Sequence, residues 1–232
     1  MSPLLHFAEH RLQEVALVFM AVVYTTRLVW IFRFKAGRDR QPRTGRRDTS
    51  PRAAALLSIG NIAMPWAMES TRRHPFFYLQ FVLFHLAVVA AITLSFVIPY
   101  APDLLAGTAV VRIFQVAIGL GCVVGIGRFV RRCTVRHMRA ISTPDDFFSL
   151  ALLTIWFAAG VLAASNDTSG GERHLLAYIF LTAFFLVYVP FSKISHYLYY
   201  PFTRYWLGRT LGYRGVFPIE SLRGPRAARG RP

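Results

Sequence analysis

The chain contains little cysteine and few acidic residues. Its two cysteines, Cys122 and Cys133, would lie about 16 Å apart along one helix, which is too far for a disulfide. A zinc or iron–sulfur site needs more thiolates than two, so any such cluster belongs to a partner. We expect no buried acid and no pair of broken helices in repeated halves, and this disfavours a transporter.

Long apolar runs make up most of the sequence. The chain has 232 residues, of which 54% are hydrophobic and 15% aromatic, yet its formal net charge is +16. A membrane span needs roughly 20 apolar residues, and five runs satisfy this: about 12–32, 76–98, 108–130, 147–165 and 174–200. The first run is too long for a signal peptide and lacks a basic leading region. We therefore predict an all-α integral membrane protein with five transmembrane helices.

The basic residues predict how this bundle is oriented. Most of the 27 Lys and Arg residues lie in the connection 33–73, in the segment after the third span and in the C-terminal segment. The opposite loops, 99–107 and 166–173, carry Arg173 as their single basic residue. Because cytoplasmic loops retain Lys and Arg, we predict an N-terminus outside the cell and a cytosolic C-terminus.

The predicted domains follow from the same pattern. We predict a membrane domain over residues 1–200 and a basic cytosolic tail over 201–232. Within the basic loop 33–73, the apolar segment 53–68 is too short to span a membrane, so we predict that it forms an interfacial helix. The charges lie next to membrane spans, so topology and anionic lipid explain them better than nucleic acid does. Segments 33–52 and 222–232, rich in Gly, Pro and Arg, are expected to be extended until they dock on a cytosolic protein or on lipid.

Two histidines lie inside apolar runs, where a polar side chain is costly. His85 is on the second predicted span and His196 on the fifth, and we expect both near the cytosolic face. Neutral imidazole is a common axial ligand of haem iron, and an ionisable residue in a membrane span indicates a functional site. The alternative is a structural hydrogen bond to a neighbouring helix. The other five histidines are expected to be solvated.

Three further residues have two interpretations each. Gly121 and Gly125 on the third span allow close helix packing, and they also leave room for a flat macrocycle. Arg27, near the cytosolic end of the first span, either extends its guanidinium to the membrane surface or contacts a haem propionate.

Three motifs resemble a known family. They are LFH at 83–85, RRCTVRHMRAISTPDD at 131–146, and PFSKISH at 190–196 followed by Pro201. Together with five spans, they resemble the cytochrome b (gamma) subunit of respiratory nitrate reductases. They are also similar to membrane cytochromes b of heterodisulfide-reductase-like and sulfite-reductase-associated complexes. The resemblance covers most of the chain, weakly in the first span, and excludes 36–70 and the last fifteen residues.

The resemblance implies the haem ligands. Diheme members of the family use four histidines, and the haem nearer the cytosol takes the positions that match His85 and His196. The outer haem takes positions occupied here by Ser95 and Tyr178. Because both outer ligands are missing, we predict a single haem b held by His85 and His196. The rival is a diheme variant in which His174 serves an outer haem.

The resemblance also implies a function. The chain would transfer electrons between membrane quinone or quinol and a cytosolic iron–sulfur, molybdenum or heterodisulfide-reductase-like subunit, as the membrane subunit of an oxidoreductase complex. Its expected location is the inner (cytoplasmic) membrane of a prokaryotic cell. The expected partners include lipid but no nucleic acid, and no residue is predicted to be catalytic. The alternative from a different class is a membrane anchor without redox activity, whose histidines are structural.

Overall fold

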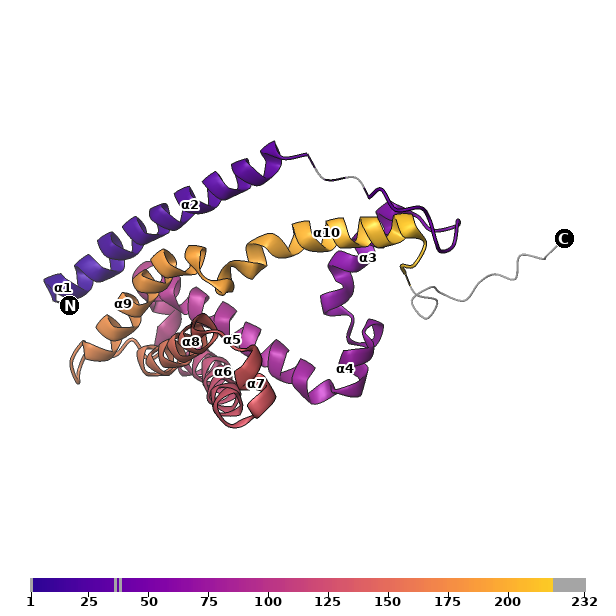
Figure 1. Ribbon diagram of the computed structural model, residues 1–232. Helices are drawn as coiled ribbons and strands as arrows, with labels where there is room; N and C mark the ends of the chain where they lie inside the picture. Colours follow the sequence, from indigo (N-terminus) through magenta and orange to yellow (C-terminus); the bar gives the residue numbers. More distant parts are fainter. Residues whose placement is uncertain (1, 36, 38, 219–232) are drawn as a thin grey trace. The chain divides into compact units, whose positions relative to one another are not determined.

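The computed structural model describes residues 2–35, 37 and 39–218, and within these residues the chain is helical, with no strand (Figure 1). The α-helices are α1 (Pro3–His6), α2 (Gln13–Arg33), α3 (Pro51–Gly60), α4 (Glu69–Arg73), α5 (Pro75–Tyr100), α6 (Thr108–Thr134), α7 (Arg136–Ile141), α8 (Pro144–Ala163), α9 (Arg173–Tyr188) and α10 (His196–Arg214). A π-helical turn, η1 (Phe7–Leu12), joins α1 to α2. Short 3₁₀ helices are η2 (Asn61–Ala63), η3 (Pro65–Ala67), η4 (Pro102–Ala106), η5 (Val189–Phe191) and η6 (Lys193–Ser195).

The helices form two compact units. The first comprises residues 1–31 and 79–195, and the second comprises residues 32–78 and 196–232. Each unit joins segments that are far apart in the sequence, and each is described below by itself.

Five helical segments are long and apolar enough to cross a membrane, as predicted. They are Pro3–Arg33, Pro75–Tyr100, Thr108–Thr134, Pro144–Ala163 and Arg173–Phe191. The fifth is shorter than the predicted run 174–200. Proline removes a backbone donor and collides with the carbonyl four residues earlier, and here α9 ends at Tyr188, two residues before Pro190. The chain is thus a multi-pass helical protein by length and composition.

An apolar core holds the first unit together. Helix α8 packs on both α6 and α9, and its Trp156 and Phe157 are buried with Ile118 of α6 and Tyr178 of α9. The Trp156 and Tyr178 rings stack with centroids 6.0 Å apart. Burial of large aromatic side chains contributes most of the stabilisation in such a core.

Small residues hold the second unit together. Helix α3 packs along α10 at Gly208 and Gly212, which are both buried. A methyl group on Gly208 would lie 2.6 Å from the carbonyl oxygen of Ala54 and 2.6 Å from Cβ of Ser58. These two backbones therefore approach as closely as glycine allows. Residues 53–68 were predicted to form one interfacial helix. They instead contain most of α3, the 3₁₀ helices η2 and η3, and the residue before α4.

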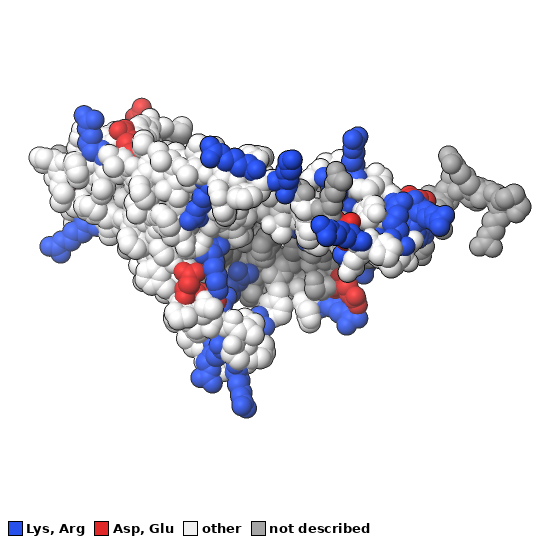
Figure 2. All heavy atoms as spheres, turned by 45° about the horizontal axis from the view of Figure 1, so that its top comes forward, with Lys and Arg blue, Asp and Glu red and all other residues white. Residues whose placement is uncertain are grey.

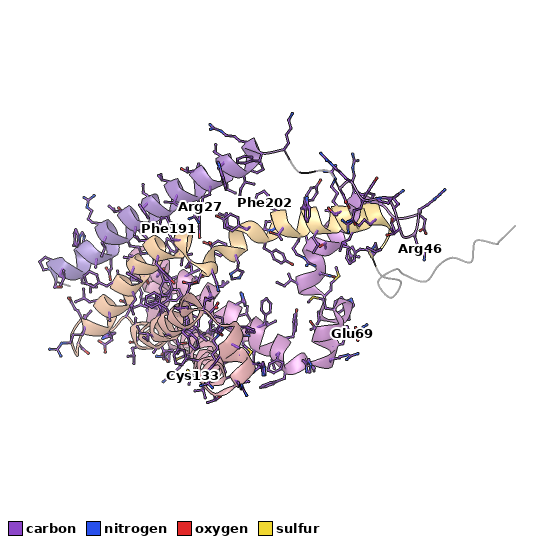
Figure 3. All side chains as sticks on the ribbon, viewed as in Figure 1. Arg27, Arg46, Glu69, Cys133, Phe191 and Phe202 are labelled. Atoms are coloured by element: carbon purple, nitrogen blue, oxygen red, sulfur yellow. The ribbon has the colours of Figure 1, made fainter. Side chains whose placement is uncertain are left out.

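Polar contacts to backbone oxygens complete the second unit. Arg204 Nε donates to Ser58 O at 3.0 Å, and Thr49 Oγ1 donates to Gly212 O at 2.7 Å. The Arg214 guanidinium pairs with Asp39 at 2.5 Å, and this hydrogen bond holds the pKa of Asp39 below its usual value. Two more ion pairs lie on exposed segments, Arg46 with Asp48 and Arg73 with Glu69 (Figure 3).

Basic side chains outnumber acidic ones on the face shown in Figure 2. The segment after α2 meets the end of α10 at a group of basic residues that includes Arg43, Arg46 and Arg214. The predicted docking segment 222–232 lies outside the described residues, as does Arg38 of segment 33–52. Residues 201–214 of the predicted tail belong to α10.

Candidate functional site

His85 lies in the middle of α5 and is half-buried. Its Nδ1 is 2.7 Å from the carbonyl oxygen of Phe81, one turn earlier. A carbonyl oxygen only accepts hydrogen bonds, so Nδ1 carries the hydrogen and the lone pair of neutral imidazole is on Nε2. Metal-binding histidines commonly donate their second nitrogen to a backbone carbonyl in this way. The His85 imidazole therefore fits the role of an axial ligand.

His196 is the first residue of α10. The boundary between the two units falls directly before it, so it belongs to the second unit, whereas His85 belongs to the first. The His196 ring is exposed and lies edge-on to Tyr197. The prediction that His196 lies inside a continuous span is wrong, because α9 ends at Tyr188 and a new helix begins at His196.

Residues 189–195 separate α9 from α10, and we call this segment the 189–195 break. Freed backbone groups of a broken membrane helix need other partners, and serine side chains supply them here. Ser192 Oγ donates to Val189 O at 3.1 Å and accepts from the Ile194 N–H at 3.2 Å. Ser195 Oγ donates to Ser192 O at 2.8 Å. The two serines of the PFSKISH motif thus stabilise the bend that leads into His196.

The start of α8 fixes one side of this break. Lys193 Nζ donates to Thr143 Oγ1 at 2.8 Å and to Asp146 Oδ2 at 2.9 Å. Asp145 accepts hydrogen bonds from the Tyr188 hydroxyl at 2.5 Å and from the Lys193 backbone N–H at 3.3 Å. Thr143 and Asp146 also form a capping box at the start of α8. The structure adds that STPDD and PFSKISH, two motifs of the resemblance, contact each other.

Arg27 of α2 contacts the same break. Its guanidinium donates to the carbonyl oxygen of Pro190 and lies 5.2 Å from the centroid of the Phe191 ring (Figure 3). An arginine at this place satisfies a carbonyl that the interrupted helix leaves without its usual partner. The contact with a haem propionate stays a prediction.

Gly121 and Gly125 lie where α6 packs on its neighbours. A methyl group on Gly121 would overlap Ala87 of α5, and one on Gly125 would overlap Thr154 of α8. This geometry fits close helix packing. The role of these glycines in haem packing stays a prediction.

Side chains fill the position that the resemblance gives to an outer haem. Tyr178 is fully buried, and its hydroxyl donates to the carbonyl oxygen of Ala91 on α5. Ser95 is also buried, and its hydroxyl donates to Ile92 O at 2.8 Å. A methyl group on Gly160 would lie 3.1 Å from the Tyr178 ring. In this arrangement the side chains of Tyr178 and Ser95 pack the space between α5 and α9.

A buried acid near the start of the chain corrects the sequence analysis. Glu9 lies in η1 and is 3% exposed, and Gln13, at the start of α2, is fully buried. We expected no buried acid because the first run was taken to begin at residue 12. The helical part of the chain begins at Pro3 instead, and its first turns pack on α9. The π-helical turn has no plain sequence signal, but such turns often occur at functional sites.

The described residues around His174, the ligand of the alternative diheme prediction, form no metal-binding cluster. His174 is the second residue of α9 and is half-buried. Just before it, Glu172 accepts hydrogen bonds from Ser2, and these lower the pKa of Glu172. Within residues 2–35, 37 and 39–218, no three His, Cys, Asp or Glu side chains are placed to hold a metal ion.

Comparison with known proteins identifies a relative. No family model and no solved structure matches the chain. A protein of Nitratidesulfovibrio vulgaris (strain Hildenborough) is 31% identical over 170 residues, which cover 66% of this chain and 70% of that protein. Its name, "Protein", states no activity. At this identity and coverage, the chain belongs to the same family as this N. vulgaris protein.

Proposed function

We propose that the chain is the cytochrome b subunit of a membrane oxidoreductase complex. It transfers electrons between membrane quinol or quinone and a cytosolic iron–sulfur, molybdenum or heterodisulfide-reductase-like partner, through one haem b ligated by His85 and His196. The basic connections face the cytosol of a prokaryotic cell, and the chain resides in its inner membrane.

The hydrogen bond of His85 carries this proposal. The contact of His85 Nδ1 with Phe81 O at 2.7 Å orients the ring in the way that is common among metal-binding histidines, which coordinate through the other ring nitrogen. The second ligand, His196, follows a motif whose backbone is fixed by contacts from α2 and α8.

The filled position at Tyr178 and Ser95 supports one haem rather than two. Neither side chain is an ordinary haem ligand at such a site, and Tyr178 uses its hydroxyl on Ala91 O. The alternative outer ligand, His174, lies at the start of α9, about one helical turn before the outer haem position at Tyr178.

A bis-histidine haem would supply one-electron transfer, with no open iron position for bond chemistry. The protein's own contribution is to orient the ligands. The Phe81 carbonyl sets the tautomer of His85, whereas Arg27, Asp145 and Lys193 hold the segment before His196.

Visible absorption of the purified full-length protein tests the proposal. We expect a reduced-minus-oxidised difference band of b type and a haem-to-protein ratio near one. Replacement of His85 or His196 by Ala abolishes the band, and the control variant His174→Ala retains it. Absence of a b-type band in protein made with ample haem refutes the proposal and favours a non-redox anchor. A ratio near two refutes the single haem.

A further inference from the structure

One face of α10 is exposed and rich in aromatic side chains. Trp206, Arg209 and Tyr213 follow one another at the spacing of a single helical face, and Phe202 precedes them by about one turn. Trp206 is 49% exposed and Tyr213 is 41% exposed. The buried glycines of α10 lie on another face, against α3. We call Phe202, Trp206, Arg209 and Tyr213 the aromatic face of α10.

The second unit contains the ends of two membrane-length helices. The segment Pro3–Arg33 ends in it, and α5 begins in it. The Phe32 ring lies edge-on to the ring of Phe202, which Figure 3 labels, with centroids 5.5 Å apart. At the start of α5, the Tyr78 hydroxyl donates to Ile62 O at 3.0 Å. The aromatic face therefore begins beside the end of a membrane-length helix, and Trp and Tyr gather at such ends in membrane proteins.

The charge of the second unit suits an anionic surface. The described part of this unit holds three acidic residues. An arginine binds each of them: Asp39 pairs with Arg214, Asp48 with Arg46, and Glu69 with Arg73. Arg209 is exposed on the aromatic face, and the Arg43 guanidinium lies 5.5 Å from the centroid of the Tyr213 ring. Positive charge thus borders the aromatic rings, and basic side chains at such a place favour binding to an anionic leaflet.

We propose that the aromatic face of α10 binds anionic phospholipid, so that α10 lies along the membrane surface. Its rings enter the boundary between headgroups and acyl chains, which is where amphipathic helices with aromatic and basic side chains bind. Arg209 and Arg43 donate hydrogen bonds to the lipid phosphate, for which the guanidinium fork is well shaped. Residues 201–214, predicted as the start of a cytosolic tail, then form a membrane-surface helix. The inference does not depend on the haem.

Quenching of Trp206 fluorescence by brominated lipid tests the site. The sample is the full-length chain in nanodiscs that mix phosphatidylcholine with phosphatidylglycerol, and it carries Trp30→Phe and Trp66→Phe, both at exposed positions. Trp206 and Trp156 are then the remaining tryptophans, and Trp156 is 3% exposed in the apolar core of the first unit. Bromine on an acyl chain quenches an indole that it contacts. Trp156 therefore gives a constant background, which the further variant Trp206→Phe measures.

We expect stronger quenching when phosphatidylglycerol carries the bromine than when phosphatidylcholine carries it in the same mixture. Arg209→Gln lowers this preference for the anionic lipid about fivefold, as expected for one basic side chain near an anionic surface. Arg173→Gln is the charge-matched control, because Arg173 lies in the first unit at the start of α9. The control leaves the preference unchanged.

Each other result overturns the inference. No quenching of Trp206 by either brominated lipid means that the aromatic face lies in water or under a cytosolic protein. Equal quenching by the two lipids means that the face enters the membrane without selecting anionic headgroups. An unchanged preference in Arg209→Gln assigns the selectivity to other residues. A visible spectrum of the same sample tests the haem separately, so either proposal can fail without the other.

Discussion

The two units of the chain are stabilised by different interactions. In the first, large side chains such as Trp156 and Tyr178 are buried between helices, and polar contacts gather at the 189–195 break. In the second, glycines let α3 and α10 touch at backbone level, and arginines bind carbonyl oxygens and carboxylates. The aromatic core of the first unit should therefore be sensitive to loss of volume, and the contact of α3 with α10 in the second unit to gain of volume.

The largest expected effect is a loss of volume in the first unit. Tyr178→Ala removes a fully buried ring that stacks on Trp156, and we expect the free energy of unfolding to fall by about 3 to 5 kcal/mol. Thermal denaturation in detergent measures it. Tyr178→Phe, which removes the hydroxyl alone, should cost about 1 kcal/mol. Equal losses for the two variants would contradict a packed ring as the main contribution.

A gain of volume in the second unit comes next. Gly208→Leu places side-chain atoms against Ala54 O and Ser58, and we expect a loss of about 2 to 3 kcal/mol. Gly127→Leu on α6 is the control, because no atom lies within 4 Å of the added Cβ there. Faster hydrogen exchange across α3 and α10, with the first unit unchanged, would localise the effect. If Gly208→Leu is as stable as the control, the close contact between α3 and α10 does not stabilise the second unit.

A smaller effect is expected at the polar contacts between α8 and the 189–195 break. Asp145→Ala leaves the Tyr188 hydroxyl and the Lys193 backbone N–H without this acceptor, at a cost of about 1 to 2 kcal/mol. If His196 binds haem, the variant also shifts the reduction potential, because the segment before the ligand is loosened. Asp103→Ala is the control, in the short helix η4. An unchanged potential would make Asp145 a purely structural residue.

The smallest effect concerns pH in the second unit. Asp39 accepts a hydrogen bond from Arg214, which lowers its pKa in the folded chain. A lowered folded-state pKa stabilises the fold above the unfolded pKa, and this contribution disappears as the pH falls through the folded value. We expect hydrogen exchange around residues 39–46, corrected for its intrinsic pH dependence, to become faster as the pH falls below about 4, the usual pKa of an aspartate. Asp39→Asn should abolish this dependence, and an unchanged dependence would assign it to another carboxylate.

The sequence predicted most of the first unit because hydropathy reports directly on helices of membrane length. Three of the five spans, the second to the fourth, were placed within a few residues at both ends, and the first was placed correctly at its end but not at its start. The fifth was extended too far because Pro190 was treated as part of a helix, although proline commonly interrupts one. Glu9 was missed because the first run was taken to begin at residue 12, after Glu9 and His10.

The second unit could not be predicted in the same way. Its contacts depend on Gly208 and Gly212 lying opposite Ala54 and Ser58, about 150 residues away in the sequence. No apolar periodicity marks that pairing, and arginines that bind backbone carbonyls look like ordinary surface charge. The histidine pair was visible from the sequence, but the Phe81 hydrogen bond that fixes the His85 tautomer needed coordinates.

In a bilayer, the 189–195 break would limit the length of the fifth span. One uninterrupted helix from Arg173 to Arg214 would be roughly 60 Å long, about twice the thickness of the hydrocarbon layer. Such a helix would have to tilt or slide to hide its apolar length. By ending α9 at Tyr188, the chain gives this span a fixed hydrophobic length. A thicker or thinner membrane would therefore strain the polar contacts of Asp145 and Arg27 first.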